Sequence, residues 1–367
     1  MNKFKSIFTI ILVFLFVFGF TVFSFVMPDK ATSIEENRPL QQFPVVNKDT
    51  VMGGSFMTDF DKYTLDQFPL RNTFRQLKSD FVFNLYNQKD NNGYFLKGDY
   101  IFKNDHKYNS QSVDKAINKI TSYKNTLLSE NNKVYISIIP DKNYYLESEL
   151  KLSYDYDRLF TTVKENIDFA EYIDISNLLT LDSFYATDTH WRQEKIEIVA
   201  EEILKSMNPD FKSVPFETVT TEKFFNGVYA RQTSFKTNGD EMKYLINDLL
   251  NDAVLTDKTT DEVLPIYNLE KIESSEPYDM FMSGAKMGLI TLERKEKTTG
   301  KELIVFRDSF GSSIGPLLLQ GYDKITFIDT RQILPAVIKQ KNLVEFSNQD
   351  VLFLYSSTVL NDSSEMK

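Results

Sequence analysis

Residues 303–311 read Leu-Ile-Val-Phe-Arg-Asp-Ser-Phe-Gly, an apolar run that ends abruptly in a polar turn. An uninterrupted apolar run of this kind is typical of a strand buried on both faces of a sheet. A helical pattern follows at once over 311–320, so we expect Ser309 to lie on a tight strand-to-helix turn. In open α/β sheets, ligands bind at the carboxyl ends of the strands, which is where this turn would lie.

The same alternation of strand-like and helix-like segments recurs along much of the chain. Short apolar runs predict strands, and amphipathic patterns predict helices between them. The expected strands are 133–140, 172–175, 303–306, 324–329 and 350–355, and the expected helices are 112–130, 154–169, 190–207, 311–320 and 333–341. The alternation predicts an α/β fold, a parallel sheet with helices on both faces. Residues from about 209 to 300 interrupt this alternation. We interpret them as an insertion on the sheet whose acidic residues face solvent.

Composition excludes several classes of function. The chain has 367 residues, of which 42% are hydrophobic, and a formal net charge of -10. Without a basic surface, general binding to nucleic acid is disfavoured. The sequence contains no Cys and only two His, His106 and His190, which excludes disulfides, thiolate catalysis and His-rich or Cys-based metal sites. We therefore expect no metal and no cofactor. His106 lies in a polar stretch and is interpreted as a solvated loop residue.

The N-terminus carries an uncharged apolar stretch at residues 7–27, preceded by Lys3 and Lys5. Its length matches a transmembrane helix, and the preceding positive charges favour a cytoplasmic N-terminus. We therefore predict a cytoplasmic stub and anchor (1–27), a proline-containing tether (28–50) and an extracellular domain (51–367). A cleaved signal peptide, which needs a small-x-small cleavage site, and a buried helix of a soluble protein are the alternatives.

Two segments carry candidate chemistry. Asp188 and His190 are two residues apart, so in extended backbone their side chains point to the same side. The carboxylate can then hold one ring nitrogen, while the other nitrogen takes a proton from a hydroxyl such as that of Ser309. We predict that His190 and Ser309 lie within hydrogen-bonding distance, about 2.6–3.2 Å. The alternative is that these residues only cap the helices expected to follow them.

These segments also resemble a known family. Asp188-Thr189-His190-Trp191 resembles the Asp-x-His-Trp motif of the DHHW and alginate O-acetyltransferase-like proteins, which belong to the SGNH-hydrolase-like group. Asp308-Ser309-Phe310 resembles their nucleophile block. Further segments resemble the family in the same order along the chain, at 36–44, 68–71, 92–99, 140–142 and 225–229.

The resemblance implies an SGNH-hydrolase-like domain that transfers acetyl groups to hydroxyls of an extracellular or cell-wall polysaccharide. In these terms Ser309 is the nucleophile that forms an acyl-serine intermediate, His190 is the general base and Asp188 orients it. A membrane-bound O-acyltransferase would supply the acyl group. A carbohydrate esterase, or a non-catalytic scaffold or glycan-binding protein on the same fold, remains an alternative.

The sequence departs from the family pattern at several places. Arg307 stands where related proteins often have Gly, and Ala285 replaces an Asn that usually ends its block. The sequence therefore does not decide which residues would donate hydrogen bonds to an oxyanion. Asn226 and Gly227 are the candidates. Arg331 is a candidate to hold an anionic group of the substrate, with an ordinary surface ion pair as the alternative.

Overall fold

The computed structural model describes residues 2–33, 35–36, 38–84, 90–91, 93–104, 107–146, 154–284 and 287–367, so His106 and Ala285 lie outside the described residues. The chain forms two compact units. The smaller unit is Met1–Asn92 with Ala230–Lys236, and the larger unit is Gly93–Tyr229 with Thr237–Lys367. This division by packing falls later in the chain than residue 50, where the expected tether ends.

The larger unit is built on a sheet of eight strands within the described residues, in the order β11-β10-β12-β14-β13-β15-β6-β7. The strands are β6 (Lys133–Ile139), β7 (Glu171–Tyr172), β10 (Ala253–Asp257), β11 (Glu262–Leu264), β12 (Leu289–Arg294), β13 (Glu302–Arg307), β14 (Lys324–Ile328) and β15 (Asp350–Ser356). From β14 to β7 all neighbours are parallel, which confirms the predicted parallel sheet. The pairs that join β11, β10, β12 and β14 are antiparallel. The sheet is therefore mixed, because the insertion adds three strands to its edge.

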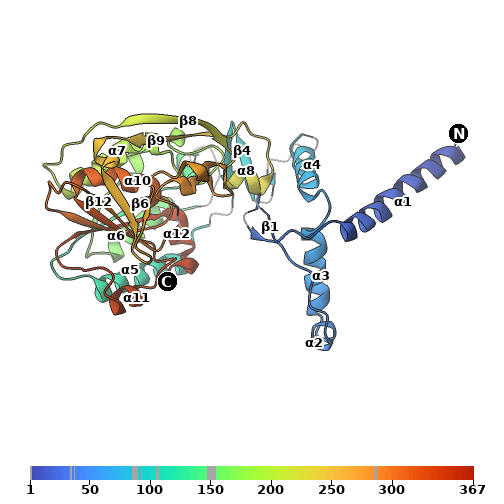
Figure 1. The fold of residues 1–367 in the computed structure, drawn as a ribbon, viewed down its shortest axis with the longest axis horizontal. Helices are drawn as coiled ribbons and strands as arrows, with labels where there is room; N and C mark the ends of the chain where they lie inside the picture. Colours follow the sequence, from blue (N-terminus) through green and yellow to red (C-terminus); the bar gives the residue numbers. More distant parts are fainter. Residues whose placement is uncertain are drawn as a thin grey trace. The chain divides into compact units, whose positions relative to one another are not determined.

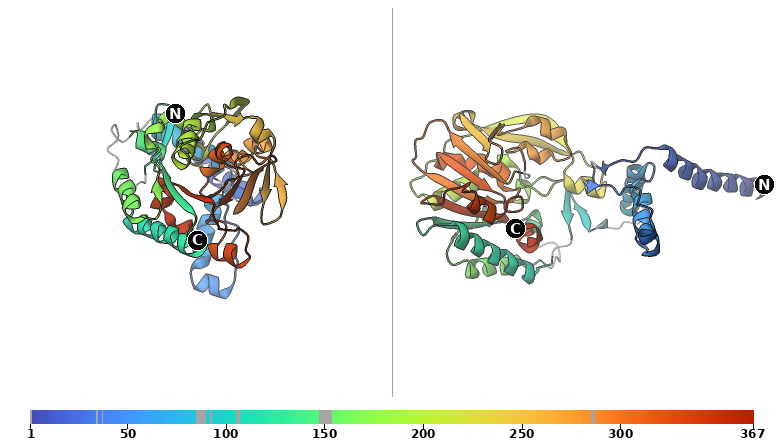
Figure 2. Two further views of the ribbon diagram at one scale, coloured as in Figure 1. Left: turned by 90° about the vertical axis from the view of Figure 1, so that its left-hand side faces the viewer. Right: turned by 60° about the horizontal axis from the view of Figure 1, so that its bottom comes forward.

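Helices cover both faces of this sheet, as predicted (Figures 1 and 2). One set consists of α5 (Ser110–Leu127), α6 (Tyr156–Asn166), α11 (Pro335–Gln340) and α12 (Ser357–Asn361), and the other of α7 (Glu197–Met207) and α10 (Gly311–Leu318). Alternate residues of β13 pack on opposite faces of the sheet. Ile304 and Phe306 pack with α5 and α6, whereas Leu303 and Val305 pack with α7 and α10. This two-sided burial explains the uninterrupted apolar run of β13.

The helix predicted over 190–207 begins later than expected. Its regular part is α7, which starts at Glu197 after a short 3-10 turn at Gln193–Lys195. A bridge between Phe184 and Trp191 holds the preceding chain as a narrow loop, and the N–H of Tyr185 donates to the carbonyl of His190 at 3.0 Å. Because these bonds keep His190 in the loop, it does not lie in the first turn of a helix.

The rest of the insertion lies outside the eight-stranded sheet, and residues 230–236 of it belong to the smaller unit. Its elements are β8 (Glu217–Phe225), α8 (Val228–Thr233), β9 (Asp240–Ile246), α9 (Asp248–Asn251) and two 3-10 turns at Leu269–Glu273 and Pro277–Met280. The strands β8 and β9 pair antiparallel. Phe225, Met242, Tyr278 and Phe281 share a small apolar cluster with Tyr185. The insertion is therefore packed against the loop that carries the candidate histidine. Two further strands of the larger unit, β4 (Tyr94–Lys97) and β5 (Tyr100–Lys103), form a hairpin.

The smaller unit consists mainly of helices. Its elements are α1 (Asn2–Val26), β1 (Thr32–Ser33), β2 (Arg38–Pro39), α2 (Lys48–Met52), α3 (Ser55–Asp66), α4 (Arg71–Asn84) and β3 (Asp90–Asn91). Residues 3–26 of α1 are long and apolar enough to cross a membrane, and none of the most apolar window is buried inside the protein. This helix fits the predicted anchor. The expected tether includes the short pair β1 and β2.

Candidate active site

Ser309 lies on the turn between β13, which ends at Arg307, and α10, which begins at Gly311. The carboxylate of Asp308 is fully buried and shapes this turn. It accepts hydrogen bonds from the N–H of Phe310 at 2.9 Å and from the N–H of Ser356, at the end of the neighbouring strand β15, at 2.7 Å. These bonds fix the half-buried Ser309 at the carboxyl end of the parallel strands.

The structure brings Asp188, His190 and Ser309 together although 119 positions separate the last two. His190 Nε2 lies 2.9 Å from Ser309 Oγ, and His190 Nδ1 lies 2.7 Å from Asp188 Oδ1. The predicted hydrogen bond between His190 and Ser309 is therefore present. With the Nδ1 proton directed at the carboxylate, the lone pair of Nε2 faces the hydroxyl, which is the tautomer that the hydrogen bonds imply.

Asp188 is held as a carboxylate by its surroundings. Burial by itself would raise its pKa, but the hydrogen bond and charge interaction with His190 and the backbone N–H groups of Val228 and His190 hold the pKa well below its ordinary value. The N–H of Val228 donates to Oδ2 at 2.8 Å and the N–H of His190 donates to Oδ1 at 3.1 Å. The negative charge therefore stays beside the imidazole over the whole neutral range of pH.

Tyr278 fixes the plane of the imidazole, and Trp191 helps to hold the loop that carries it. Tyr278, from the insertion, stacks on His190 with ring centroids 3.8 Å apart and planes 7° from parallel. The hydroxyl of Tyr278 donates to Ser313 Oγ at 2.6 Å, and Trp191 Nε1 donates to the same oxygen at 2.8 Å. Because Ser313 belongs to α10, these bonds tie the histidine loop to the helix that begins just after Ser309. They also explain why a fully buried Trp follows His190.

Lys142 supports the loop that carries Asp188 and His190. It is buried, and its Nζ donates to the carbonyls of Tyr185, Ala186 and Asp188 at 3.0, 3.1 and 2.7 Å. Burial lowers the pKa of Lys142 to about 7, against the opposing charge of Asp188. Asp240 completes the support by accepting from the N–H groups of Ala186 and Thr187. The loop geometry thus depends on two buried charged groups far away in sequence.

Replacing Lys142 by methionine should slow the reaction of the Ser309 hydroxyl with an activated ester about 10–100-fold, the cost of a misplaced supporting group. Methionine supplies a similar apolar stem but lacks the terminal amino group, so three loop carbonyls lose their donor. Buried unpaired acceptors each cost about 1–3 kcal/mol. Rapid-mixing kinetics with an activated acyl ester would measure the effect. Lys295→Met, at an exposed site, is the control. A Lys142→Met protein that acylates at the rate of the unmodified chain would contradict the role given to this lysine.

The backbone N–H of Gly227 is already bonded within the protein, whereas Asn226 as an oxyanion donor stays a prediction. The N–H of Gly227 donates to Thr187 Oγ1 at 2.9 Å and is not free to bind an oxyanion. Asn226 is exposed, and its amide oxygen accepts from the hydroxyl of Thr237 at 2.6 Å. Gly227 has a different use: a Cβ at this position would lie only 2.4 Å from Cβ of Asp188. It allows the backbone to approach the carboxylate closely.

Gly227→Ala is therefore expected to displace Asp188 and to lower both activity and stability. Overpacking of this kind costs about 1–3 kcal/mol, because the clash is with the Cα and Cβ of Asp188 and not with a flexible side-chain end. Calorimetry and acylation kinetics together would measure it. The neighbouring Asn226→Ala variant should behave like the unmodified chain in both assays, and equal behaviour of the two variants would count against this interpretation.

Two arginines lie near the turn that carries Ser309. Arg331, the candidate for an anionic group, makes two bonds to the carboxylate of Asp329 at 3.0 and 2.7 Å, so it is an ion pair, although a largely buried one. Arg307 is fully buried, and its Nη1 donates to the carbonyl of Asp308 and to Ser312 Oγ. Its Nε and Nη2 have no hydrogen-bond partner among the described residues. Arg307, which stands where related proteins often have Gly, therefore stabilises the turn through buried hydrogen bonds.

Sequence reasoning found the three central residues but missed their supports. Val228, Asp240 and Tyr278 come from the insertion, where the segment 225–229 resembles the family but did not indicate a contact with Asp188 or His190. Lys142 had a signal, because the Pro-x-Lys block at 140–142 resembles the family. For Tyr278 the signal was the family-like block 278–285. Within the described residues, no group of three or more His, Cys, Asp or Glu side chains is arranged to hold a metal ion.

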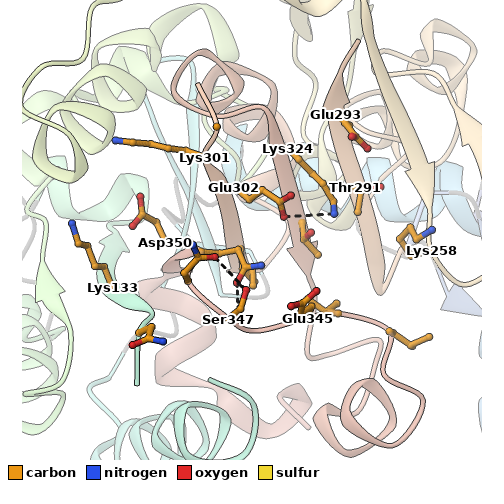
Figure 3. Close-up of a pocket in the computed structure, with 18 of the residues that line it drawn as sticks. Lys133, Lys258, Thr291, Glu293, Lys301, Glu302, Lys324, Glu345, Ser347 and Asp350 are labelled. Carbon is orange, nitrogen blue, oxygen red and sulfur yellow. Dashed lines mark hydrogen bonds and ion pairs between the residues drawn. The ribbon is translucent and has the colours of Figure 1, made fainter. Parts of the chain in front are cut away.

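A polar groove of about 670 Å³ lies at the opposite ends of the same strands (Figure 3). Its lining includes Lys133, Glu302, Lys324 and Asp350, which are the first residues of β6, β13, β14 and β15. Lysines and carboxylates alternate around it, and Lys324 pairs with Glu302 at 3.6 Å. Because the candidate triad lies at the carboxyl ends of the strands, this groove is separate from it.

Comparison with solved structures identifies the fold. A DHHW family protein from Eubacterium siraeum superposes with a TM-score of 0.60 at 18% sequence identity, over 76% of this chain and 95% of that chain. PatB1 from Bacillus cereus, solved with a sulfonyl adduct, superposes with a TM-score of 0.58 at 17% identity, over 73% of this chain and 95% of that chain. No protein-family model matches the sequence, and no curated protein sequence does so either. The chain therefore shares its fold with these two proteins, one of which is a DHHW family protein.

Proposed function

We propose that this chain is a membrane-anchored serine O-acyltransferase that transfers an acyl group, expected to be acetyl, to hydroxyls of an extracellular or cell-wall polysaccharide. The observation that carries the proposal is the unbroken chain of hydrogen bonds from Asp188 through His190 to Ser309. Such a chain is the arrangement that activates a serine as a nucleophile. The fold shared with PatB1 and the DHHW family protein is consistent with it.

The reaction would proceed in two halves. Ser309 Oγ attacks the carbonyl carbon of the acyl donor and passes its proton to His190 Nε2; the tetrahedral intermediate then collapses, and His190 returns the proton to the leaving group. A sugar hydroxyl next gives its proton to His190 and attacks the acyl-serine, which transfers the acyl group and regenerates Ser309. Asp188 stabilises the imidazolium that forms in both halves.

The oxyanion needs donors close to Ser309. The backbone N–H of Ser309 makes no hydrogen bond to any other described residue, so it is available at the amino end of the turn into α10. The buried positive charge of Arg307 adds a favourable field behind the same turn. We propose these two groups in place of Asn226 and Gly227.

The same triad would also support an esterase, because hydrolysis differs only in the use of water as the acceptor. Transfer to a polysaccharide requires that the domain lies outside the cell. We propose that α1 is a single-pass anchor with a cytoplasmic N-terminus, since Lys3 and Lys5 flank its first end. A membrane-bound O-acyltransferase, as the resemblance implies, is proposed as the source of the acyl group.

The test is to compare envelope polysaccharides from cells with and without the full-length protein by mass spectrometry. Loss of O-acyl groups on deletion, with recovery on re-expression, is the expected result for a transferase. An increase in O-acyl groups on deletion would indicate an esterase, and unchanged acylation would contradict both activities. Direct labelling of the purified chain by a sulfonyl fluoride, the type of reagent that leaves a sulfonyl adduct on an activated nucleophile, tests the nucleophile separately.

A further inference from the structure

An aromatic cluster joins the end of α1 to the rest of the smaller unit. Phe20 of α1 stacks on Phe68, with ring centroids 5.4 Å apart and planes 5° from parallel, and meets the edge of Phe74 at 5.6 Å. Phe43 packs edge-on against the apolar face of α3, with Tyr63 at 5.3 Å and Phe60 at 6.1 Å. None of these residues takes part in the candidate active site.

The contacts extend well down the apolar helix. A groove of about 460 Å³ is lined on one side by α1, from Phe16 to Phe25, and on the other by Phe43, Phe60 and Phe68 among others. Phe16 lies ten residues before Val26, the last residue of α1, which corresponds to about 15 Å of helix. That is roughly half the thickness of the hydrocarbon core of a bilayer. If α1 crosses a membrane, the groove and its far wall lie at the depth of the outer leaflet.

The chain on either side of this wall also exposes apolar side chains, most of them outside the lining of the groove. Val46 and Met57 are 64% and 59% exposed, and others with large exposed areas are Phe43, Val45, Val51, Met52, Leu65 and Leu70. On α3, Phe56, Met57, Phe60 and Tyr63 share one side of the helix, whereas Asp59, Asp61 and Lys62 share the other. An amphipathic helix of this pattern is typical of an element that lies in a membrane interface.

A polar hub fixes α3 and α4 in this position. The guanidinium of Arg38 makes two bonds to the carboxylate of Asp66, at the end of α3, at 2.6 and 2.8 Å. Glu36 accepts from Arg38 at 2.6 Å and pairs with Arg71 and Arg75 of α4 at 2.8 and 3.1 Å. Residues of the segments at 36–44 and 68–71, which resemble the family, therefore tie the end of α3 to α4.

We propose that α3 and Phe43 form an interfacial element that is immersed in the outer leaflet, and that acyl chains of membrane lipids fill the groove beside α1. The proposal rests on the proposed anchoring of α1, because the groove is continuous with the apolar surface of that helix. This continuity favours lipid as the occupant. The last turns of α1 and the side chains of Phe43, Phe60 and Phe68 line the same groove, so the lipid that surrounds α1 in a membrane would also contact these side chains.

Site-directed spin labelling can test this cleanly, because the chain has no Cys. Single-cysteine variants Met57→Cys and Val46→Cys of the full chain would be labelled with a nitroxide and reconstituted into phosphatidylcholine–phosphatidylglycerol vesicles. Leu12→Cys, in the middle of α1, is the lipid reference. Lys62→Cys, on the charged side of α3 with 61% of its side chain exposed, is the aqueous reference. Collision rates with apolar oxygen and with a water-soluble nickel chelate report the surroundings of each label.

Labels at positions 57 and 46 are expected to show an oxygen-to-nickel ratio close to that at position 12 and several-fold above that at position 62. If position 12 is in lipid but 57 and 46 match position 62, the interfacial element is wrong while the anchor stands. If position 12 is itself aqueous, both the anchor and this inference fail. Protection of position 57 from both reagents would indicate that a protein partner or a second copy covers this side of α3, and would also overturn the proposal.

Discussion

Replacing Ser309 by alanine is expected to abolish covalent labelling by an acyl donor or a sulfonyl fluoride and to reduce acyl transfer by at least about 10⁴-fold. Neither nearby serine can take its place. Ser312 Oγ is bound by Arg307, and Ser313 Oγ accepts from Trp191 and Tyr278; both serines are buried. The fold should be unaffected, because Ser309 is half-buried and its side chain bonds only to His190 among the described residues.

Intact-mass spectrometry after incubation with an acyl ester measures the labelling, and product analysis measures the transfer. Ser364→Ala, at an exposed residue of the same unit, should label fully and serves as the control. A Ser309→Ala protein that still gains one acyl group per chain would show that the nucleophile is elsewhere, and the proposed mechanism would then be wrong.

Asp188→Asn is expected to give the second-largest loss, about 10³–10⁴-fold in the rate of acylation, by analogy with the same change in serine proteases. The amide has nearly the shape of the carboxylate, so the bond from the N–H of Val228 can persist. It cannot, however, stabilise an imidazolium by charge, and it favours the tautomer in which Nε2 carries the proton. His190 would then face Ser309 with a proton instead of a lone pair.

Stopped-flow acylation measures this loss, and circular dichroism checks that the fold persists. The variant should also change the response to acid. Because the folded pKa of Asp188 is depressed, its carboxylate adds stability that is present above the ordinary pKa and is lost as pH falls through the folded value. Melting temperatures of Asp188→Asn should therefore fall less steeply than those of the unmodified chain in strongly acidic solution. A variant with the normal rate of acylation would remove Asp188 from the mechanism.

Local pattern alone predicted the core of the fold. The apolar runs at 133–140, 303–306, 324–329 and 350–355 became β6, β13, β14 and β15 because strands buried on both faces carry no polar alternation. The same rule failed for the edge of the sheet. The strands β10, β11 and β12 lie in the insertion, where polar residues obscure the period, and their antiparallel pairing depends on partners distant in sequence.

The candidate site divides in the same way. Three features depend only on residues that are close together in the chain, so the sequence by itself determined them. They are the spacing of Asp188 and His190, the strand-to-helix turn at Ser309 and the apolar span of α1. Only the tertiary structure decided that Lys142 and Tyr278 support the histidine, that Gly227 is a packing residue and not a donor, and that α3 lines a groove together with the end of α1. The reason is physical: periodicity and turn chemistry act between near neighbours, whereas these contacts join residues that meet only when the folded chain closes around them.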